Sequence, residues 1–193
     1  MLWCWIENNI IELLSCLVTI LGLIYGLYQW KRSVIVKRAD FVFKIYEKLR
    51  LDKDIMNAVY MIDYDKTWYQ PDFHKKHKVK CLSEQNKELY MDKFFSVLSY
   101  ICYLQENGCI DEKEFQLFKY DIDRVCKSYQ CQNYLWNIYH FSNDELHTKC
   151  PYDEIINYAI TNGMIAPKIF FSQEECFYKN YVDFIGQNER RLS

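Results

Sequence analysis

The hydrophobic pattern separates one long apolar stretch near the N-terminus from a series of shorter amphipathic stretches. No residue from Leu13 to Trp30 is charged. With Ile10 and Ile11, at about 1.5 Å per helical residue, this stretch can cross a hydrocarbon core of roughly 30 Å. A buried core helix rarely runs this far without a charge, and a signal peptide would need a basic N-terminal region and a small-residue cleavage site. We therefore predict a transmembrane helix, with residues 1–33 as N-terminal segment and anchor.

The charges beside this stretch predict its orientation. Two acidic residues, Glu7 and Glu12, precede it, and basic residues follow it: Lys31, Arg32, Lys37 and Arg38. Because basic flanks stay in the cytoplasm, we expect the N-terminus outside and residues 34–193 in a cytoplasmic domain. Tryptophan and tyrosine residues near both ends of the stretch suit interfacial aromatic belts.

Small and polar residues form one stripe along the predicted membrane helix. They alternate at spacings of three and four residues, which is a heptad pattern: Glu12, Ser15, Thr19, Gly22, Gly26, Gln29 and Ser33. We call this stripe the polar seam. In lipid, helices associate through close backbone packing and interhelical hydrogen bonds, so we expect Gly22 and Gly26 at helix-packing positions.

The polar seam predicts a homo-oligomer of this helix. In a parallel assembly of about four or more copies, a tetramer for example, the seam would face the axis as a narrow polar pore. The residues expected to line that pore are Glu12, Ser15, Thr19 and Gln29. A packed dimer or trimer without a lumen is the alternative.

The remainder of the chain predicts an array of helices. Phe41, Ile45 and Leu49 recur at helical spacing, so the membrane helix either continues or restarts there. Helix signals then cover these ranges: 54–64, 83–106, 111–125, 131–141, 151–162 and 172–184. Their ends carry capping signals: Ser83, Asn107-Gly108, the Asp111/Glu114 capping box, Asn162-Gly163 and the Ser172/Glu175 capping box. With only 5 Gly and 3 Pro and no convincing strand, we predict an all-α fold.

Composition narrows the environment and the partners. The formal net charge of −2 gives no basic excess that would indicate nucleic acid as a bulk partner. The 9 cysteines contain no CxxC pair and mostly lie within apolar-periodic stretches. We expect them to be free thiols that pack as small hydrophobic residues in a reducing compartment.

No motif indicates catalysis or a bound metal. His74 and His77 have the spacing of metal ligands, but neighbouring lysines oppose a cation, so a solvated basic loop or an anion-binding patch fits better. Cysteines and histidines that could act as nucleophile and base lack a local activating group: Cys126, Cys131, His140 and His147. We expect no enzyme, no catalytic residue, no metal and no cofactor.

Basic and aromatic residues coincide in two places that could hold a nucleotide. The first joins Trp68 and Tyr69 to a basic run with these lysines: Lys75, Lys76 and Lys78. The second has Arg124 and Lys127 before two tyrosines. Phosphates bind lysine and arginine, whereas bases stack on aromatic faces. The alternative is that the aromatic rings are core and the charges are solvated.

Four stretches of packing residues carry a likeness to a known family. They are ADFVFKIYEKLR (39–50), AVYMIDYDK (58–66), FFSVLSYICYLQENGCID (94–111) and NYLWNIYHF (133–141). They resemble a bacterial family of small single-pass membrane proteins with a helical cytoplasmic domain. The architecture is also similar to the transmembrane effector of Hailong-type phage-defence systems, which pair such an effector with a nucleotidyltransferase.

The resemblance implies a function but no ligand residues. It implies an oligomeric channel in the bacterial inner membrane, gated by a nucleotide or short oligonucleotide from the partner nucleotidyltransferase, whose opening depolarises an infected cell. The alternative is a membrane-anchored helical scaffold that binds a protein partner and forms no pore.

Overall fold

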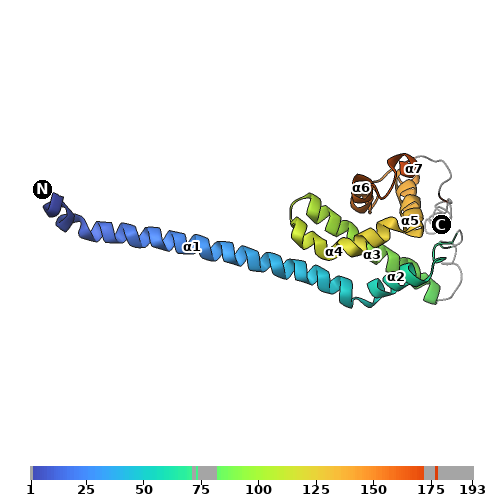
Figure 1. The fold of residues 1–193 in the computed structure, drawn as a ribbon, viewed down its shortest axis with the longest axis horizontal. Coiled ribbons are helices and arrows are strands. Elements are labelled where there is room, and N and C mark those ends of the chain that lie inside the picture. The colour runs from blue at the N-terminus through green and yellow to red at the C-terminus, as the bar shows by residue number, and fades with distance from the viewer. Residues whose placement is uncertain (1, 71–72, 74–81, 172–176, 178–193) are drawn as a thin grey trace, which may run out of the picture. The chain divides into compact units, whose positions relative to one another are not determined.

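Every element that the structure describes is a helix, which confirms the predicted all-α fold. The structure is a computed structural model that describes residues 2–70, 73, 82–171 and 177 (Figure 1). The chain divides into two compact units, Met1–Ile45 and Tyr46–Ser193. We call the second unit the helical domain and describe each unit by itself.

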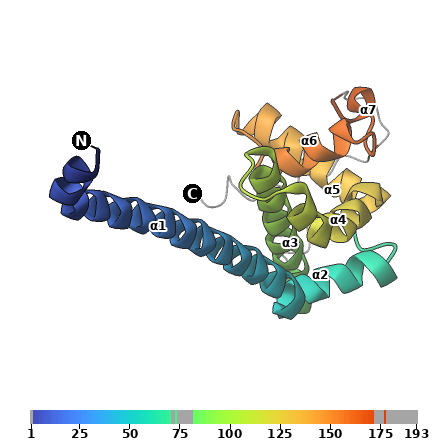
Figure 2. The ribbon, with the colours of Figure 1, turned by 60° about the vertical axis from the view of Figure 1, so that its left-hand side comes forward.

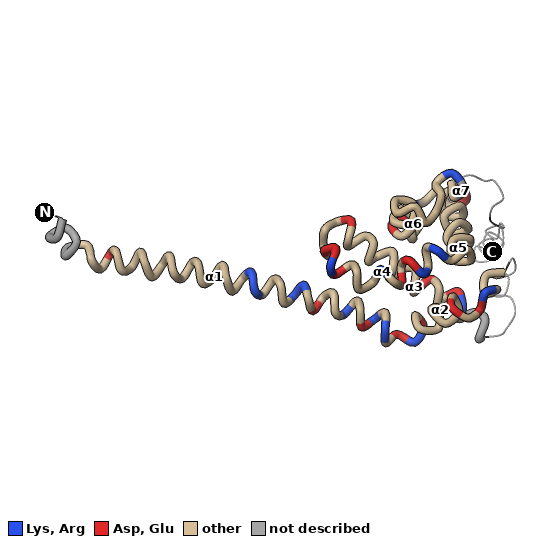
Figure 3. The backbone as a smooth tube through the Cα atoms, viewed as in Figure 1, with Lys and Arg blue, Asp and Glu red and all other residues tan. Residues whose placement is uncertain are grey.

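The first helix, α1 (Leu2–Leu51), is unbroken over 50 residues. It is therefore about 75 Å long, and the membrane helix continues through Phe41 and Ile45 instead of restarting. The predicted division between residues 33 and 34 falls inside this helix, just after the uncharged stretch that ends at Trp30. One helix is long and apolar enough to span a membrane, within Asn9–Leu51. Figure 3 shows its uncharged stretch, followed first by basic residues and then by a mixture of acidic and basic residues.

A capping aspartate begins the second helix, α2 (Lys53–Tyr64). The Asp52 carboxylate accepts hydrogen bonds from the backbone N–H groups of Asp54 (3.0 Å) and Ile55 (3.4 Å), which satisfies donors that a helix start leaves free. The same carboxylate lies 2.7 Å from the Lys93 ammonium on α3 (Leu82–Glu106). Helix α3 begins one residue before the predicted cap, Ser83.

The predicted capping box between α3 and the next helix is confirmed. The N–H of Glu114 donates to the Asp111 carboxylate (2.9 Å), and the N–H of Asp111 donates to the Glu114 carboxylate (2.7 Å). This box opens α4 (Glu112–Lys127). The preceding turn needs Gly108, whose φ of +66° is a left-handed conformation that favours glycine.

Past α4 the chain follows the predicted helix order with three differences. Helix α5 (Tyr129–His140) passes into a π-helical turn, η2 (Phe141–Glu145), that no sequence signal predicted. Helix α6 (Asp153–Thr161) begins two residues after Pro151. A short helix, α7 (Pro167–Phe171), was also not predicted.

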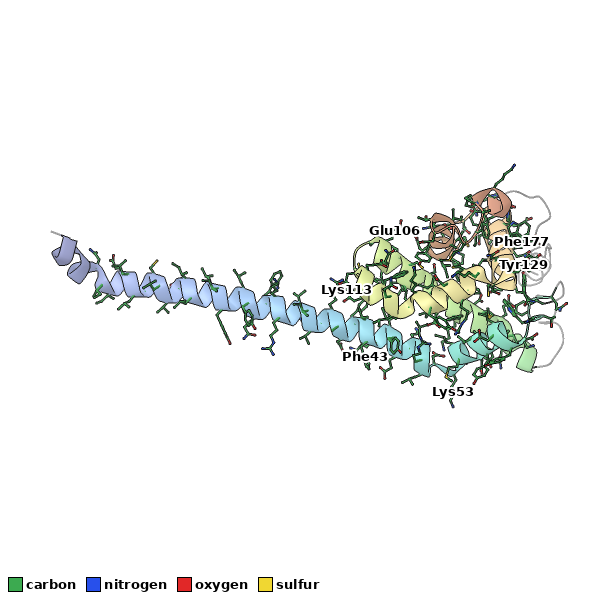
Figure 4. The ribbon with its side chains drawn as sticks, in the orientation of Figure 1. Phe43, Lys53, Glu106, Lys113, Tyr129 and Phe177 are labelled. Carbon is green, nitrogen blue, oxygen red and sulfur yellow. The ribbon has the colours of Figure 1, made fainter. Side chains whose placement is uncertain are left out.

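The predicted last helix and its capping box, Ser172 and Glu175, lie outside the described residues. Phe177 is described. It is buried, and its ring lies 5.5 Å from that of Tyr129 (Figure 4).

Helix α3 is the centre of the helical domain, with α2, α4 and α6 packed against it (Figure 2). Its inward stripe is fully buried: Met91, Phe94, Phe95, Leu98 and Ile101. The facing stripe of α4 is buried as predicted: Phe115, Phe118, Ile122 and Val125. The buried cysteines are free thiols, in line with their expected role as small hydrophobic residues: Cys102, Cys126, Cys131 and Cys150.

Candidate functional site

The polar seam lies on α1, within the candidate membrane span Asn9–Leu51. No residue in the most apolar window of that span is buried. Figure 4 shows the side chains of this stretch projecting on all sides of the helix. A shallow groove on its surface is lined by three of the predicted pore residues and their neighbours: Ile11, Glu12, Ser15, Cys16, Thr19 and Ile20. The structure thus brings Glu12, Ser15 and Thr19 together on one face.

Two seam side chains have donors that bond within α1. The Thr19 hydroxyl donates to the backbone carbonyl of Ser15 (2.8 Å), and the Gln29 amide donates to the Tyr25 hydroxyl (2.7 Å). A donor left without a partner in hydrocarbon is costly, so these local bonds let single copies enter lipid. A neighbouring helix could then exchange them for bonds between helices.

No contact within the described part of the chain explains the two seam glycines. A Cβ added at Gly22 or Gly26 would meet no atom within 4 Å. Glycine destabilises a helix by about 1 kcal/mol relative to alanine, and no contact described within α1 requires glycine at these positions. Gly108 and Gly163 differ, because their positive φ values of 66° and 68° explain glycine locally. The open surface at Gly22 and Gly26 suits close approach by another helix.

The first predicted nucleotide-binding place is part of the core. Trp68 and Tyr69 are only 4% and 1% exposed. Their rings lie 5.8 and 5.4 Å from that of Tyr134, and Phe73 joins the same cluster. Their faces are therefore covered by protein and are not presented as stacking surfaces. The predicted lysines of this place, Lys75, Lys76 and Lys78, lie outside the described residues.

Arg124 and Lys127 of the second predicted place line an open cleft of about 560 Å³, which we call the Arg124 cleft. It is lined by residues of α2 and α4: Asp63, Gln116, Lys119, Tyr120, Asp123, Arg124 and Lys127. Trp68 and Tyr69 are not among them. The two tyrosines predicted beside Arg124 and Lys127, Tyr129 and Tyr134, are not among the lining residues either, and Tyr134 is fully buried. Arg124 lies 3.3 Å from Asp63, and Lys127 lies 3.3 Å from Asp123. An anionic ligand would have to displace these carboxylates.

Behind the Arg124 cleft lies a buried carboxylate that the sequence interpretation missed. The Asp121 side chain is only 2% exposed; its Oδ2 accepts a 3.0 Å hydrogen bond from Arg50, and its Oδ1 lies 3.7 Å from Arg124. Arg50 lies in the last turn of α1. The signal was available, because Asp121 falls between Phe118 and Ile122 on the apolar face of α4.

Three of the four residues considered for catalysis, Cys126, Cys131 and His140, are buried in the core, whereas His147 is exposed. Burial raises the pKa of the Cys131 thiol to about 12 and that of Cys126 well above its ordinary value, which opposes formation of a thiolate. The buried His140 ring lies between the Asp144 carboxylate (3.1 Å) and the Phe170 carbonyl (3.2 Å). His140 is thus a core histidine with a partner at each ring nitrogen.

A second cleft, of about 260 Å³, lies between α3, α4 and α6. Its floor includes the buried thiol of Cys102, whose pKa burial raises to about 12. At its rim Glu154 accepts a 2.8 Å hydrogen bond from Lys149, and the Lys119 ammonium lies 3.4 Å from the Tyr158 hydroxyl. Among the described residues no group of acidic, cysteine or histidine side chains is arranged to hold a metal.

No protein-family model, curated protein or solved structure matches this chain. The resemblance to a family of small membrane effectors therefore stays a prediction.

Proposed function

We propose that this protein is a homo-oligomeric membrane effector in which copies of α1 associate along the polar seam and enclose an ion-conducting pore. One observation supports this above the others. The seam glycines, Gly22 and Gly26, have open space around them and no local reason to be glycine, on a helix whose most apolar window contains no buried residue. Such a surface is typical of a helix that packs against other membrane helices.

The remaining seam residues support a pore over a closed contact. Glu12, Ser15, Thr19 and Gln29 would give the axis of a parallel bundle hydroxyl, amide and carboxylate groups, which can replace part of the hydration shell of an ion. Polar groups inside a membrane are costly unless they face one another or water. Glu12 would form an acidic ring at the outer mouth.

Gating would use the Arg124 cleft. Arg124 faces the cleft and lies 3.7 Å from Asp121, and Asp121 pairs with Arg50 at the end of α1. An anionic ligand that draws Arg124 away from Asp63 and Asp121 would change this ion-pair network, and with it the last turn of α1. The nucleotide ligand, the partner nucleotidyltransferase and a role in phage defence in the bacterial inner membrane come from the resemblance alone.

Ionic current through the purified full-length protein in a planar bilayer tests the pore. We expect discrete currents that Thr19→Leu or Gly22→Leu abolishes. Val18→Leu is the matched control, because Val18 adjoins the seam without belonging to it. Loss of current in all three variants, or in none, would contradict the seam as the conducting surface.

A second candidate function, an anchored scaffold, is favoured by an apolar stripe on α2. Met56, Tyr60 and Tyr64 are 43%, 60% and 78% exposed, and the two tyrosine rings stack at 5.5 Å. Such a stripe suits a protein partner. Replacing α1 up to Trp30 with an unrelated apolar helix separates the candidates: a scaffold keeps its biological effect, and a channel loses it.

A further inference from the structure

The heptad pattern of the polar seam does not stop at the end of the apolar stretch. Since α1 is unbroken to Leu51, the alternation of three and four residues can be followed past Ser33. The next apolar positions on the stripe are Val36 and Phe43, which are 61% and 60% exposed (Phe43 is labelled in Figure 4). Both belong to the same compact unit as the seam.

The residue types on the stripe differ between the apolar stretch and the segment beyond it, and each set suits helix association in its own surroundings, lipid or water. Within the apolar stretch it presents small and polar residues, which associate helices in lipid, where burial of apolar surface gives no driving force. Beyond Lys31 and Arg32 it presents Val36 and Phe43. In water, apolar side chains at heptad positions bring helices together by leaving the solvent. One continuous stripe thus carries residues that favour helix association both within the apolar stretch and beyond it.

Asp40 lies between these two positions on the same stripe, where like charges of parallel copies would oppose association. The Lys44 ammonium lies 2.8 Å from the Asp40 carboxylate, one helical turn further on. Hydrogen bonding to Asp40 raises the pKa of Lys44, so this ammonium stays charged at neutral pH and offsets the neighbouring carboxylate. The carboxylate is therefore no bar to a parallel contact.

We propose that the contact between copies of α1 continues beyond the membrane as a parallel coiled coil, in which Val36 and Phe43 pack against the same residues of a second copy. The inference rests on the proposed association along the polar seam. A second copy is the occupant because the register is shared: helices that touch at Gly26 and do not break place Phe43 beside Phe43 about 25 Å further on.

Cysteine cross-linking in membranes containing the full-length protein tests this contact. The background replaces Cys4, Cys16, Cys81, Cys109 and Cys176 by serine and keeps the four buried thiols. Val36→Cys and Phe43→Cys are compared with Ile35→Cys and Phe41→Cys, which lie off the stripe, and Ser15→Cys reports on the membrane seam. We expect disulfide-linked dimers at residues 36 and 43 to form about tenfold faster than at 35 and 41, because the contact holds those thiols at high effective concentration.

The outcomes separate this inference from the function on which it rests. Cross-linking at Ser15 without cross-linking at residues 36 and 43 would overturn the inference and leave the membrane seam intact. Cross-linking at 36 but not 43 would also overturn it, because the contact would end at the membrane. Equal rates at all four outer positions would indicate random collision and overturn it as well. Failure at Ser15 and at both stripe positions would reject the seam together with its extension.

Discussion

The two units of the chain use the same residue types in opposite ways. Tyr28 on α1 is 60% exposed, whereas Tyr134 in the helical domain is fully buried. Cys16 is an exposed thiol and Cys102 a buried one. In the helical domain apolar side chains find partners within the chain. On α1 they find none within the apolar span, so its surface has to be covered from outside, by lipid and, on our proposal, by other copies.

Because of this difference, substitutions in the two units should affect different properties of the protein, namely folding stability and association. Within the helical domain a lost contact is a lost contribution to folding, because both partners belong to one chain. On our proposal, a substitution in the polar seam should leave the fold of a single copy unchanged and change the association between copies. Stability and oligomeric state are therefore separate measurements that should respond to separate sets of residues.

The largest difference is expected between a buried and an exposed apolar side chain. Phe118 is fully buried in α4, and its ring lies 6.4 Å from that of Tyr46. Phe118→Ala should lower the free energy of unfolding of the helical domain by about 3–5 kcal/mol. Leu17→Ala, at a position 56% exposed on α1, should change it by less than about 0.5 kcal/mol. Urea unfolding in detergent, followed by near-ultraviolet circular dichroism, measures both, and equal losses would refute the division.

The second-largest change in the free energy of unfolding is expected at the ion pair of the buried Asp121. Arg50→Gln removes its closest cation, so we expect the free energy of unfolding to fall by about 1–3 kcal/mol. Lys53→Gln, at an exposed lysine of α2, is the matched control. The double variant Arg50→Gln/Asp121→Asn should lose less than the sum of the single variants, because the two side chains act on one interaction. Additive losses would show that Arg50 and Asp121 contribute independently.

Two glycines, one in each unit, should show the same difference between the units with smaller changes in the free energy of unfolding. Gly163 ends α6 with φ +68°, so Gly163→Ala should lower the free energy of unfolding by about 1–2 kcal/mol. Gly22→Ala is in helical backbone with open space and should leave unfolding unchanged while weakening oligomers, as measured by sedimentation in detergent. Unfolding that responds to Gly22→Ala, or oligomers that do not, would contradict our assignment of the seam.

Much of the fold could be predicted from the sequence because its signals are local. The Asp111/Glu114 capping box and the glycines that end α3 and α6 lie where neighbouring residues alone determine the backbone. The π-helical turn after His140 could not be predicted in this way. It directly follows His140, whose ring lies 3.2 Å from the carbonyl of Phe170, and no local pattern shows a contact this distant in sequence.

The candidate sites also differ in whether they depend on a local pattern or on contacts distant in sequence. The polar seam is a periodic pattern within one helix, so sequence alone locates it. The Arg124 cleft is formed by α2 and α4 together, and the sequence placed Arg124 and Lys127 there without their partners Asp63 and Asp123. Trp68 and Tyr69 looked available beside a basic run. Their burial against Tyr134, more than sixty residues away in the chain, was not visible in any local pattern.

The smallest expected effect is a pH dependence confined to the helical domain. Hydrogen bonding from Lys93 lowers the pKa of Asp52 below its ordinary 3.8. The folded domain thus binds this proton more weakly than the unfolded chain. The stabilisation is complete above pH 3.8 and declines as the pH falls through the lowered pKa of the folded state. Asp52→Asn removes this dependence and keeps a good helix cap, since asparagine caps as well as aspartate.

We expect unfolding curves from about pH 6 to about pH 2 to show a shallower loss of stability for Asp52→Asn than for the unchanged protein. Lys93→Gln should flatten the profile to a smaller degree, because the Asp52 carboxylate keeps its hydrogen bonds from the backbone N–H groups of Asp54 and Ile55. A profile flattened by Asp52→Asn but not by Lys93→Gln would assign the effect to another partner of the carboxylate. Oligomers held by the polar seam should pass through the same titration without responding to either substitution, because both residues belong to the helical domain.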